Sequence, residues 1–438
     1  MSTACSWRRT HEVAPVTSLP RHLLPYTAEV GPTGRLSVGG CDLVELADTF
    51  GTPAYLYDED HLRAQCREVV RAFGTGATYA GKAFLCKAMA ALVHEEGLML
   101  DVATGGELHV ALAAGVPGSS IIMHGNNKSE EELTRALQVG VGRIVVDSHD
   151  EMDRIESLVG AGVGPTPRVL IRVTPGIEAH THEYVMTGQD DSKFGFGLAS
   201  GSAAEAARRA IESSGMELVG LHVHIGSNIF LLASFAKAIE RIAPFVRKLD
   251  LPELSLGGGL GVAYVAGEES ASITQWAGVL TKACAEAGIT ARLFVEPGRA
   301  IAATAGITVY RVGTIKELPG IRTYVSVDGG MSDNPRPVLY GSGYEAFLPR
   351  ATDSTRSLPV TVVGKHCESG DLVVREAWVP DDLAIGDVLA TPVTGAYGHV
   401  MASNYNKVPR PPVIFLRDGE ARVVVRRETY DDLLALDR

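Results

Sequence analysis

Short apolar runs alternate with amphipathic stretches from residue 77 to residue 300. In one typical stretch, Leu85, Met89 and Val93 recur at helical spacing. Strands that are buried on both faces of a parallel sheet read as continuous apolar runs. Eight such runs occur, at 77–80, 98–103, 121–124, 143–146, 168–173, 218–225, 253–256 and 292–295. Eight strand–helix repeats in about 225 residues predict a (β/α)8 TIM barrel, whereas the alternative, a doubly wound open sheet, usually needs fewer repeats.

Beyond residue 300 the pattern changes to β-rich runs separated by Gly, Pro and Asp turns, with few helical patterns. The runs lie at 307–315, 322–329, 358–364, 371–379, 411–417 and 421–427. They predict a second domain that is an antiparallel β-sheet, and two earlier segments, 36–38 and 43–45, are expected to add strands to it. A chain of 438 residues favours two domains. The predicted division is an N-terminal tail with strands for the β-domain at 1–45, the barrel at 46–300 and the β-domain at 301–438.

Composition narrows the class of protein. The net charge of −12 argues against a nucleic-acid partner, because no basic field would compensate phosphates. There is no secretory apolar region near the start and no uninterrupted apolar stretch of membrane-spanning length, so we expect no membrane partner and a cytoplasmic enzyme. The cysteines are scattered without CxxC spacing, which argues against a zinc ribbon or a disulfide framework, and no metal is expected.

Lys82 stands at the end of the first apolar run, in the segment YAGKA. In a TIM barrel, the residues that carry function sit at the carboxyl ends of the strands. Lysine forms Schiff bases with carbonyl cofactors once its amine is made nucleophilic. A solvated strand-end lysine is the plainer interpretation of Lys82 alone, so its role depends on what the other strand ends carry.

Three glycines, Gly257–Gly259, follow the seventh run. Residues without side chains let backbone N–H groups approach an anion, and TIM barrels often hold phosphate after strands seven and eight. Arg299 lies one strand later and Ser227 one strand earlier, which favours a phosphate site over a plain turn. GGGLG is an incomplete dinucleotide fingerprint.

Glu296 ends the eighth run, where an unpaired carboxylate is costly. It could simply pair with Arg299. The functional alternative is a partner for a pyridine nitrogen, because enzymes of the pyridoxal type place an acid or a cation there. A strand-end lysine, a phosphate loop and this acid together predict pyridoxal 5′-phosphate as the cofactor.

Cys367 lies among charged residues in GKHCESGD, unlike the inert cysteines of a core. His366 beside it could tune its pKa, which makes Cys367 a candidate proton donor. A loop cysteine without a role is the alternative.

Ten ordered motifs carry a resemblance that runs from about residue 35 to the C-terminus. They are YAGKA, LDVATGGEL, HGNNKS, HTHEYVMTGQDDSKFG, GLHVHIGSNI, LGGGLG, EPGRA, VDGGMSDNPRP, GKHCESGD and TGAYG. In this order they resemble the diaminopimelate decarboxylases, which are fold-type III, alanine-racemase-like enzymes that use pyridoxal phosphate. Small departures from the family pattern occur at Gly81, Phe84 and His399.

The resemblance implies a role for each matching residue. Lys82, Cys367 and Glu296 would be catalytic, with Lys82 carrying the cofactor, Cys367 donating a proton and Glu296 binding the ring nitrogen. His224 would stack on the ring. The implied cofactor-binding set is Lys82, Asp101, His224, Ser227, Gly257, Gly258, Gly259, Glu296, Pro297, Gly298, Arg299 and Tyr397, and the implied substrate-binding set is Arg299, Arg336, Tyr340, Glu368 and Tyr397.

The implied reaction is decarboxylation of meso-2,6-diaminopimelate to L-lysine and CO2, the last step of lysine biosynthesis. The implied active unit is a homodimer with shared sites, because in the family Cys367 and Glu368 come from the partner subunit. Alternatives are a sibling decarboxylase of ornithine, lysine, carboxynorspermidine or a carrier-bound amino acid, and a non-catalytic relative. Arg336 argues against diamine substrates, which lack a distal carboxylate. A non-catalytic relative should lack Lys82 or Cys367, and both are present.

Overall fold

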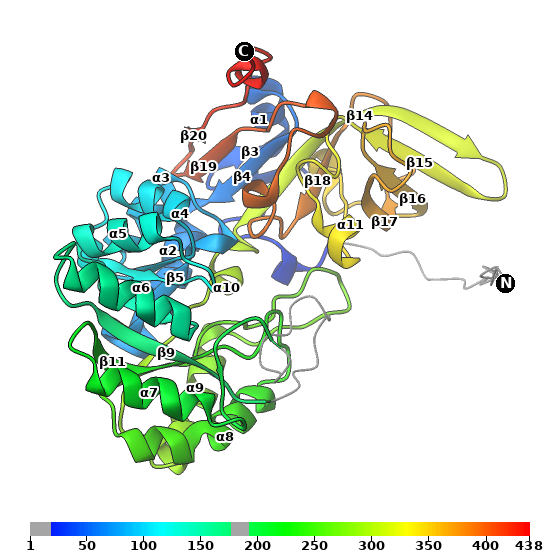
Figure 1. The fold of residues 1–438 in the computed structure, drawn as a ribbon. Coiled ribbons are helices and arrows are strands. Elements are labelled where there is room, and N and C mark those ends of the chain that lie inside the picture. Colours follow the sequence, from blue (N-terminus) through cyan, green and yellow to red (C-terminus); the bar gives the residue numbers. More distant parts are fainter. Residues whose placement is uncertain (1–18, 177–191) are drawn as a thin grey trace, which may run out of the picture.

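The computed structural model describes residues 19–176 and 192–438. Figure 1 shows two parts side by side, a barrel wrapped by helices and a sheet-based unit from which a long hairpin projects. The motif at 180–195 lies mostly outside the described residues, as does most of the predicted N-terminal tail. No helix within the two described ranges is long and apolar enough to cross a membrane.

The barrel has eight parallel strands, which confirms the fold predicted from the sequence. They are β5 (Thr78–Ala80), β6 (Met99–Val102), β7 (Ile121–Met123), β8 (Arg143–Val146), β9 (Arg168–Thr174), β11 (Glu217–Val223), β12 (Glu253–Ser255) and β13 (Arg292–Phe294), with the short β10 (Phe196–Gly197) beside β9. Neighbours pair in sequence order, and a parallel bridge between Ala77 and Val295 joins the last strand to the first. Every predicted run therefore coincides with one barrel strand, whose ends lie within two residues of the predicted ends.

Helices alternate with the barrel strands, beginning with one ahead of β5, and cover their outer side (Figure 1). They are α2 (Glu59–Phe73), α3 (Lys87–Glu95), α4 (Gly105–Ala113), α5 (Glu130–Val139), α6 (His149–Gly160), α7 (Ser202–Glu212), α8 (Ala233–Leu249), α9 (Ile273–Glu286) and α10 (Arg299–Ala302). Capping boxes begin two of them, with Ser129 and Glu132 at α5 and Ser272 and Gln275 at α9. Helix α3 begins at Lys87, two residues after Leu85, the first residue of the predicted helical spacing, and a 3-10 turn at residues 81–83 precedes it at the strand end.

The second unit is a mixed sheet, mostly antiparallel. Its strands are β4 (Ala54–Asp58), β14 (Gly306–Leu318), β15 (Arg322–Val327), β16 (Leu358–Val363), β17 (Leu372–Val379), β18 (Val388–Pro392), β19 (Val413–Arg417) and β20 (Glu420–Val425). The order is β17-β16-β15-β14-β4-β19-β20, with β18 beside β14. Two pairs, β15 with β16 and β19 with β4, are parallel. The short helix α11 (Arg336–Tyr340) faces the barrel side of this unit (Figure 1).

The segments ahead of the barrel differ from the prediction. Strand β2 (Leu36–Val38) pairs with β1 (Glu29–Val30) and β3 (Cys41–Asp42) in a small sheet of its own. Residues 43–45 begin helix α1 (Leu43–Phe50) instead of a strand, because the Asp42 carboxylate accepts hydrogen bonds from the N–H groups of Val44 and Glu45 and caps the helix. Strand β4 joins the large sheet instead. The domain boundaries at 45 and 300 remain a proposal.

An ionic cluster closes the base of the barrel, at the amino ends of its strands. Glu253 begins β12 and is 3% exposed. Its carboxylate accepts hydrogen bonds from Arg143 at 2.5 and 2.7 Å, from Arg292 at 2.5 Å and from Arg168 at 3.3 Å. Burial alone would raise the pKa of Glu253, but these guanidinium groups outweigh burial and lower it. Apolar side chains fill the barrel next to this layer, namely Ile122, Val145, Leu170, Val219 and Phe294.

We expect Glu253→Gln to destabilise the barrel by about 3–5 kcal/mol, because it removes one partner of a buried ionic cluster and leaves several cations close together. Denaturant titration followed by circular dichroism measures this change. The control is Glu212→Gln, which breaks a pair with Arg208 whose side chains are both 62% exposed. That pair should contribute less than about 1 kcal/mol. Equal midpoints for the two variants would contradict the assignment.

Candidate active site

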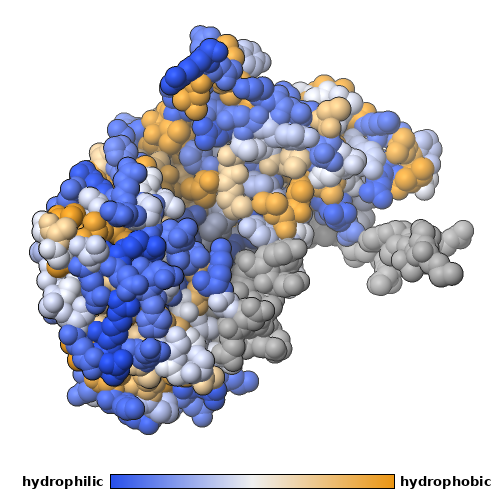
Figure 2. Space-filling view, in the orientation of Figure 1, coloured by the Kyte–Doolittle hydropathy of each residue, from blue (hydrophilic) through white to orange (hydrophobic). Residues whose placement is uncertain are grey.

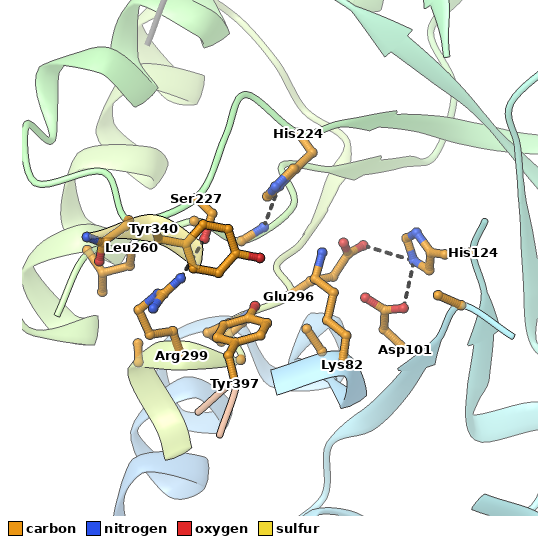
Figure 3. Close-up of a pocket in the computed structure, with 18 of the residues that line it drawn as sticks. Lys82, Asp101, His124, His224, Ser227, Leu260, Glu296, Arg299, Tyr340 and Tyr397 are labelled. Atoms are coloured by element: carbon orange, nitrogen blue, oxygen red, sulfur yellow. Dashed lines mark hydrogen bonds and ion pairs between the residues drawn. The ribbon is translucent and has the colours of Figure 1, made fainter. Parts of the chain in front are cut away.

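A cavity of about 790 Å³ opens at the carboxyl ends of the barrel strands, where the barrel meets the β-domain. Figure 3 shows its side chains converging from both parts of the chain. The barrel contributes, among others, Lys82, Asp101, His124, Arg172, His222, His224, Ser227, Gly258, Gly259, Glu296, Pro297, Gly298 and Arg299. The β-domain contributes Arg336, Tyr340 and Tyr397. Functional side chains meet at this end in TIM barrels, so the cavity is the candidate active site.

Lys82 lies directly after β5, in the 3-10 turn Gly81–Ala83. Gly81 permits this tight turn, since an added Cβ would lie 2.8 Å from the carbonyl oxygen of Asp101. The Tyr397 N–H donates to the Ala83 carbonyl oxygen at 2.8 Å, which ties a loop of the β-domain to the lysine turn. Lys82 therefore extends its amine into the cavity from a fixed strand end (Figure 3).

Glu296 follows β13 and is 6% exposed. The Ser255 hydroxyl donates to Oε1 at 2.7 Å, and Nε2 of His222 lies 3.0 Å from Oε2. Burial alone would raise the pKa of Glu296, but His222 and the two hydrogen bonds outweigh burial and hold the pKa well below its usual range. Glu296 is therefore a fixed anion at the floor of the cavity.

Asp101 and His124 complete the polar floor around Glu296. His124 lies between the two carboxylates, with Nε2 3.7 Å from Asp101 and 3.6 Å from Glu296 (Figure 3). Burial and the nearby Glu296 charge raise the pKa of Asp101 well above its usual value, although Lys82 opposes them. Burial lowers the pKa of His124, which keeps its ring neutral. The ligand atoms of His124, His222 and Glu296 lie within 4.8 Å of one another, a spacing that a metal ion could also use.

The glycine loop and His224 form another wall. Gly257 has φ +65°, and an added Cβ would lie 2.7 Å from Nδ1 of His224. The Gly258 N–H lies 3.4 Å from the same nitrogen. Burial, together with the charges of Lys82 and Arg172, lowers the pKa of His224 well below its usual value. A neutral, fixed imidazole at this place can lie against a flat ligand ring.

Arg299 begins α10 and is 8% exposed. It donates to the Ser227 hydroxyl at 3.1 Å and to the Tyr264 hydroxyl at 2.6 Å, and its guanidinium lies 4.7 Å from the Tyr397 ring centroid. Its buried Nε makes no hydrogen bond with any group in the described ranges. A buried cation, a hydroxyl and the side-chain-free loop at 258–259 fit a phosphate group. The cavity therefore suits pyridoxal phosphate, with an amine, a ring-nitrogen acid and a phosphate cradle around one space.

Arg336 points into the cavity from α11 and is 5% exposed. It donates to the Tyr344 hydroxyl at 2.7 Å, and its guanidinium lies 4.3 Å from the Tyr264 ring centroid. Among residues 19–176 and 192–438, no carboxylate lies within ion-pair distance of Arg336 or Arg299. Within the described ranges, Arg299 and Arg336 are thus two buried guanidinium groups of the cavity without a carboxylate partner, each able to bind an anionic group of a ligand.

Cys367 and Glu368 lie outside the cavity lining, in the loop between β16 and β17, and Cys367 is exposed. The Asp371 carboxylate accepts from the N–H groups of His366 and Met331 at 2.8 and 2.7 Å, which anchors the loop to the turn before α11. The His366 ring lies 2.8 Å from the Ser332 hydroxyl. These hydrogen bonds hold the loop in place, and neither Cys367 nor Glu368 lines the cavity that contains Lys82 of the same chain.

Most of the residues predicted from the sequence meet at one place. Those that line the cavity are Lys82, Asp101, His224, Ser227, Gly258, Gly259, Glu296, Pro297, Gly298, Arg299, Arg336, Tyr340 and Tyr397. Gly257 supports His224 from behind. His399 packs edge-on against Tyr55 and Phe84 and is absent from the cavity lining. Contributors that no sequence motif predicted include Ser255, Tyr264 and Tyr344. Ser255 stands just before the glycine loop, which was the available signal.

Comparisons with known proteins agree with this geometry. Residues 59–303 match the family model of the pyridoxal-dependent decarboxylase pyridoxal binding domain. The chain is 46% identical to the diaminopimelate decarboxylase of Mycobacterium tuberculosis, over 92% of this chain and 95% of that protein. It is also 46% identical to the Corynebacterium efficiens enzyme of the same name, over 96% and 95%. The crystal structure of diaminopimelate decarboxylase from M. jannaschii in complex with L-lysine superposes with a TM-score of 0.87 at 32% identity, covering 94% of this chain and 98% of that one.

The family model covers more than half of the chain, and the relatives match it along nearly their whole length. These matches extend through both the barrel and the β-domain. The chain belongs to the diaminopimelate decarboxylases, a family of pyridoxal-dependent decarboxylases.

Proposed function

We propose that the protein decarboxylates meso-2,6-diaminopimelate to L-lysine and CO2, the last step of lysine biosynthesis. The observation that carries this proposal is the pair of buried guanidinium groups, Arg299 and Arg336, on a cavity that also holds Lys82. Arg299 would bind the cofactor phosphate, and Arg336 would bind the carboxylate at the far end of the substrate. The name shared by the relatives, and the lysine bound in one of them, support this choice of substrate.

Pyridoxal phosphate, when bound, supplies an electron sink for the bond that breaks at the α-carbon of the substrate. Lys82 would hold its aldehyde carbon, and Arg299 with Ser227 and the glycine loop would hold its phosphate. His224 would lie against the ring. Asp101, Pro297, Gly298 and Tyr397 would complete the cofactor pocket, with Gly257, Gly258 and Gly259 in the loop.

Glu296 would keep a proton on the ring nitrogen. The hydrogen bonds from Ser255 and His222 support this role, because they stabilise the carboxylate in its charged form. Burial raises the pKa of Asp101 and lowers the pKa of His124, so burial favours the neutral form of each side chain. A fixed anion next to a protonated ring nitrogen strengthens the electron sink.

The substrate end combines Arg336, Tyr340, Glu368, Arg299 and Tyr397. Arg336 would bind the distal carboxylate through a planar fork of N–H donors. Glu368 would accept the distal ammonium group. Binding the remote end orients the carboxylate that leaves, so part of the binding energy lowers the barrier of the reaction.

Cys367 would donate the proton that replaces the lost carboxylate, and it would do so across a subunit boundary. Its exposure and its absence from the cavity of its own chain support a homodimer in which Cys367 and Glu368 complete the neighbouring site. Figure 2 shows hydrophobic side chains around α11, where Val338 and Leu339 are 39% and 51% exposed. Exposed apolar residues beside a cavity suit such a subunit contact. We further propose a cytoplasmic enzyme.

We expect Arg336→Ala to lower kcat/KM for meso-diaminopimelate by about 30- to 5,000-fold, since losing the partner of a buried carboxylate costs about 2–5 kcal/mol. Cofactor absorbance should stay near wild type, because the phosphate contacts belong to Arg299. CO2 release from the purified protein with added pyridoxal phosphate measures the effect.

Arg336→Lys should recover only part of the loss, because an ammonium group cannot reproduce the planar fork. Arg350→Ala is the matched control, since Arg350 pairs with Asp382 and Asp387 outside the cavity and should leave kcat/KM unchanged. The substrate assignment fails if Arg336→Ala keeps normal turnover, or if wild type prefers lysine, ornithine or the LL isomer of diaminopimelate. The cofactor assignment would still stand in that case, provided that the protein binds the cofactor and is yellow.

A further inference from the structure

Tyr264 lies a few residues after the glycine loop and is 4% exposed, between Arg299 and Arg336, two of the arginines that line the cavity. Its hydroxyl accepts from Nη1 of Arg299 at 2.6 Å. Its ring faces Arg336, whose guanidinium carbon lies 4.3 Å from the ring centroid. The Arg299 guanidinium also lies over this ring, at a longer 5.8 Å from the centroid. One tyrosine therefore contacts both cations, Arg299 mainly through the hydroxyl and Arg336 mainly through the ring.

Local contacts hold Tyr264 in this position. Its N–H donates to a carboxylate oxygen of Glu268 at 2.8 Å. Its ring packs edge-on against Tyr344, with 5.3 Å between the ring centroids. Tyr344 accepts from Arg336 at 2.7 Å but makes no hydrogen bond with Arg299. Tyr344 therefore contacts Arg336 alone of the two arginines, whereas Tyr264 contacts both Arg299 and Arg336.

Two buried guanidinium groups around one side chain repel each other strongly, since the surroundings screen charge less than water does. Tyr264 offers each cation an electron-rich partner, a hydroxyl oxygen for Arg299 and a ring face for Arg336. Burial alone would raise the pKa of the Tyr264 hydroxyl, but the two arginines outweigh burial and lower it. This shift agrees with a hydroxyl group that lies close to both positive charges.

We propose that Tyr264 is a positioning residue that separates the two arginines into two anion subsites, one for the cofactor phosphate and one for the distal carboxylate of the substrate. The assignment of the carboxylate subsite rests on the proposed function, whereas the assignment of the phosphate subsite does not. The hydroxyl of Tyr264 sets the phosphate subsite through Arg299. The ring of Tyr264 and the hydroxyl of Tyr344 set the carboxylate subsite through Arg336.

The test compares Tyr264→Phe with Tyr344→Phe in the full-length protein. Two constants are measured for each variant, the Kd of the cofactor-free protein for pyridoxal phosphate by fluorescence titration, and the KM for meso-diaminopimelate at saturating cofactor. Tyr264→Phe loses only the hydroxyl, so we expect Kd to rise about 10-fold while KM changes less than about 2-fold. Tyr344→Phe should show the reverse, a KM about 10-fold higher with Kd unchanged. Tyr264→Leu loses hydroxyl and ring, and should raise both constants.

Tyr57→Phe is the matched control, because it removes a buried hydroxyl that donates to the Gly395 carbonyl oxygen outside the cavity lining. Both constants should stay near wild type in this control. The proposal is overturned if Tyr264→Phe and Tyr344→Phe change Kd and KM in the same proportion, or if Tyr57→Phe weakens the cofactor as much as Tyr264→Phe does. If wild type does not use diaminopimelate, the proposed function fails, and the Kd comparison still decides the phosphate half.

Discussion

Lys82→Ala should abolish turnover, with kcat reduced by about 10⁴-fold or more. An amine fixed at the reacting centre acts as an intramolecular group, and such groups reach effective molarities of about 10⁵–10⁸ M. The variant should also lose the yellow colour of covalently held cofactor. Borohydride treatment of wild type followed by peptide mapping should place the reduced cofactor on the peptide that contains Lys82.

Lys87→Ala is the matched control, because Lys87 is an exposed lysine five residues away, at the start of α3. It should keep wild-type absorbance and kcat. A borohydride label on Lys87 or Lys193 would show that the strand-end lysine is not the attachment point. Normal colour and turnover in Lys82→Ala would contradict the assignment as directly.

Cys367→Ala should lower kcat by about 10²- to 10⁴-fold, the usual contribution of a positioned proton donor. Binding of the cofactor should remain near wild type, because Cys367 lies outside the cavity of its own chain. Absorbance spectra and CO2 release on the same samples separate these two effects.

Mixing Lys82→Ala with Cys367→Ala tests whether the site is shared between subunits. Random pairing of equal amounts makes about half of the dimers mixed, and each mixed dimer has one site with both residues intact. We therefore expect about one quarter of wild-type activity after full dissociation and re-association. Wild type carried through the same cycle controls for losses in refolding. Absence of recovery in the mixture, with recovery of wild type, would place both residues in sites that one chain completes alone.

The barrel was predictable from the sequence because each of its strands and helices leaves a pattern in its own short segment of the chain. Strands covered on both sides must be apolar throughout, so every run at 77–80 through 292–295 contains a real strand. The β-domain was less predictable, because its pairings join distant segments. Strand β4 comes from the start of the chain and lies between β14 and β19, and no local pattern announces such a partner. Helix α1 was missed because the cap at Asp42 outweighed the short apolar run.

The residues of the candidate site also fall into those that the sequence could predict and those that it could not. Residues at strand ends, such as Lys82 and Glu296, could be found by counting repeats, because the barrel brings all strand ends together. Tyr264 and Tyr344 could not, since each lies in a loop whose path depends on the packing of the β-domain against the barrel. Cys367 was a candidate from its charged neighbours, whereas Glu368 came from the family resemblance alone. The place of both residues outside the cavity has no counterpart in spacing or periodicity.

The cluster around Glu253 has a practical consequence for protein engineering. The cluster lies at the end of the barrel opposite the cavity. Its arginines stand on the same strands as residues of the site, but none of them lines the cavity. A library that varies Arg143, Arg168 and Arg292 can therefore be selected for heat tolerance while the reaction serves as an unchanged reporter. Thermal stability can thus be improved at the Glu253 end of the barrel, while activity at the cavity end is screened and its residues are left unchanged.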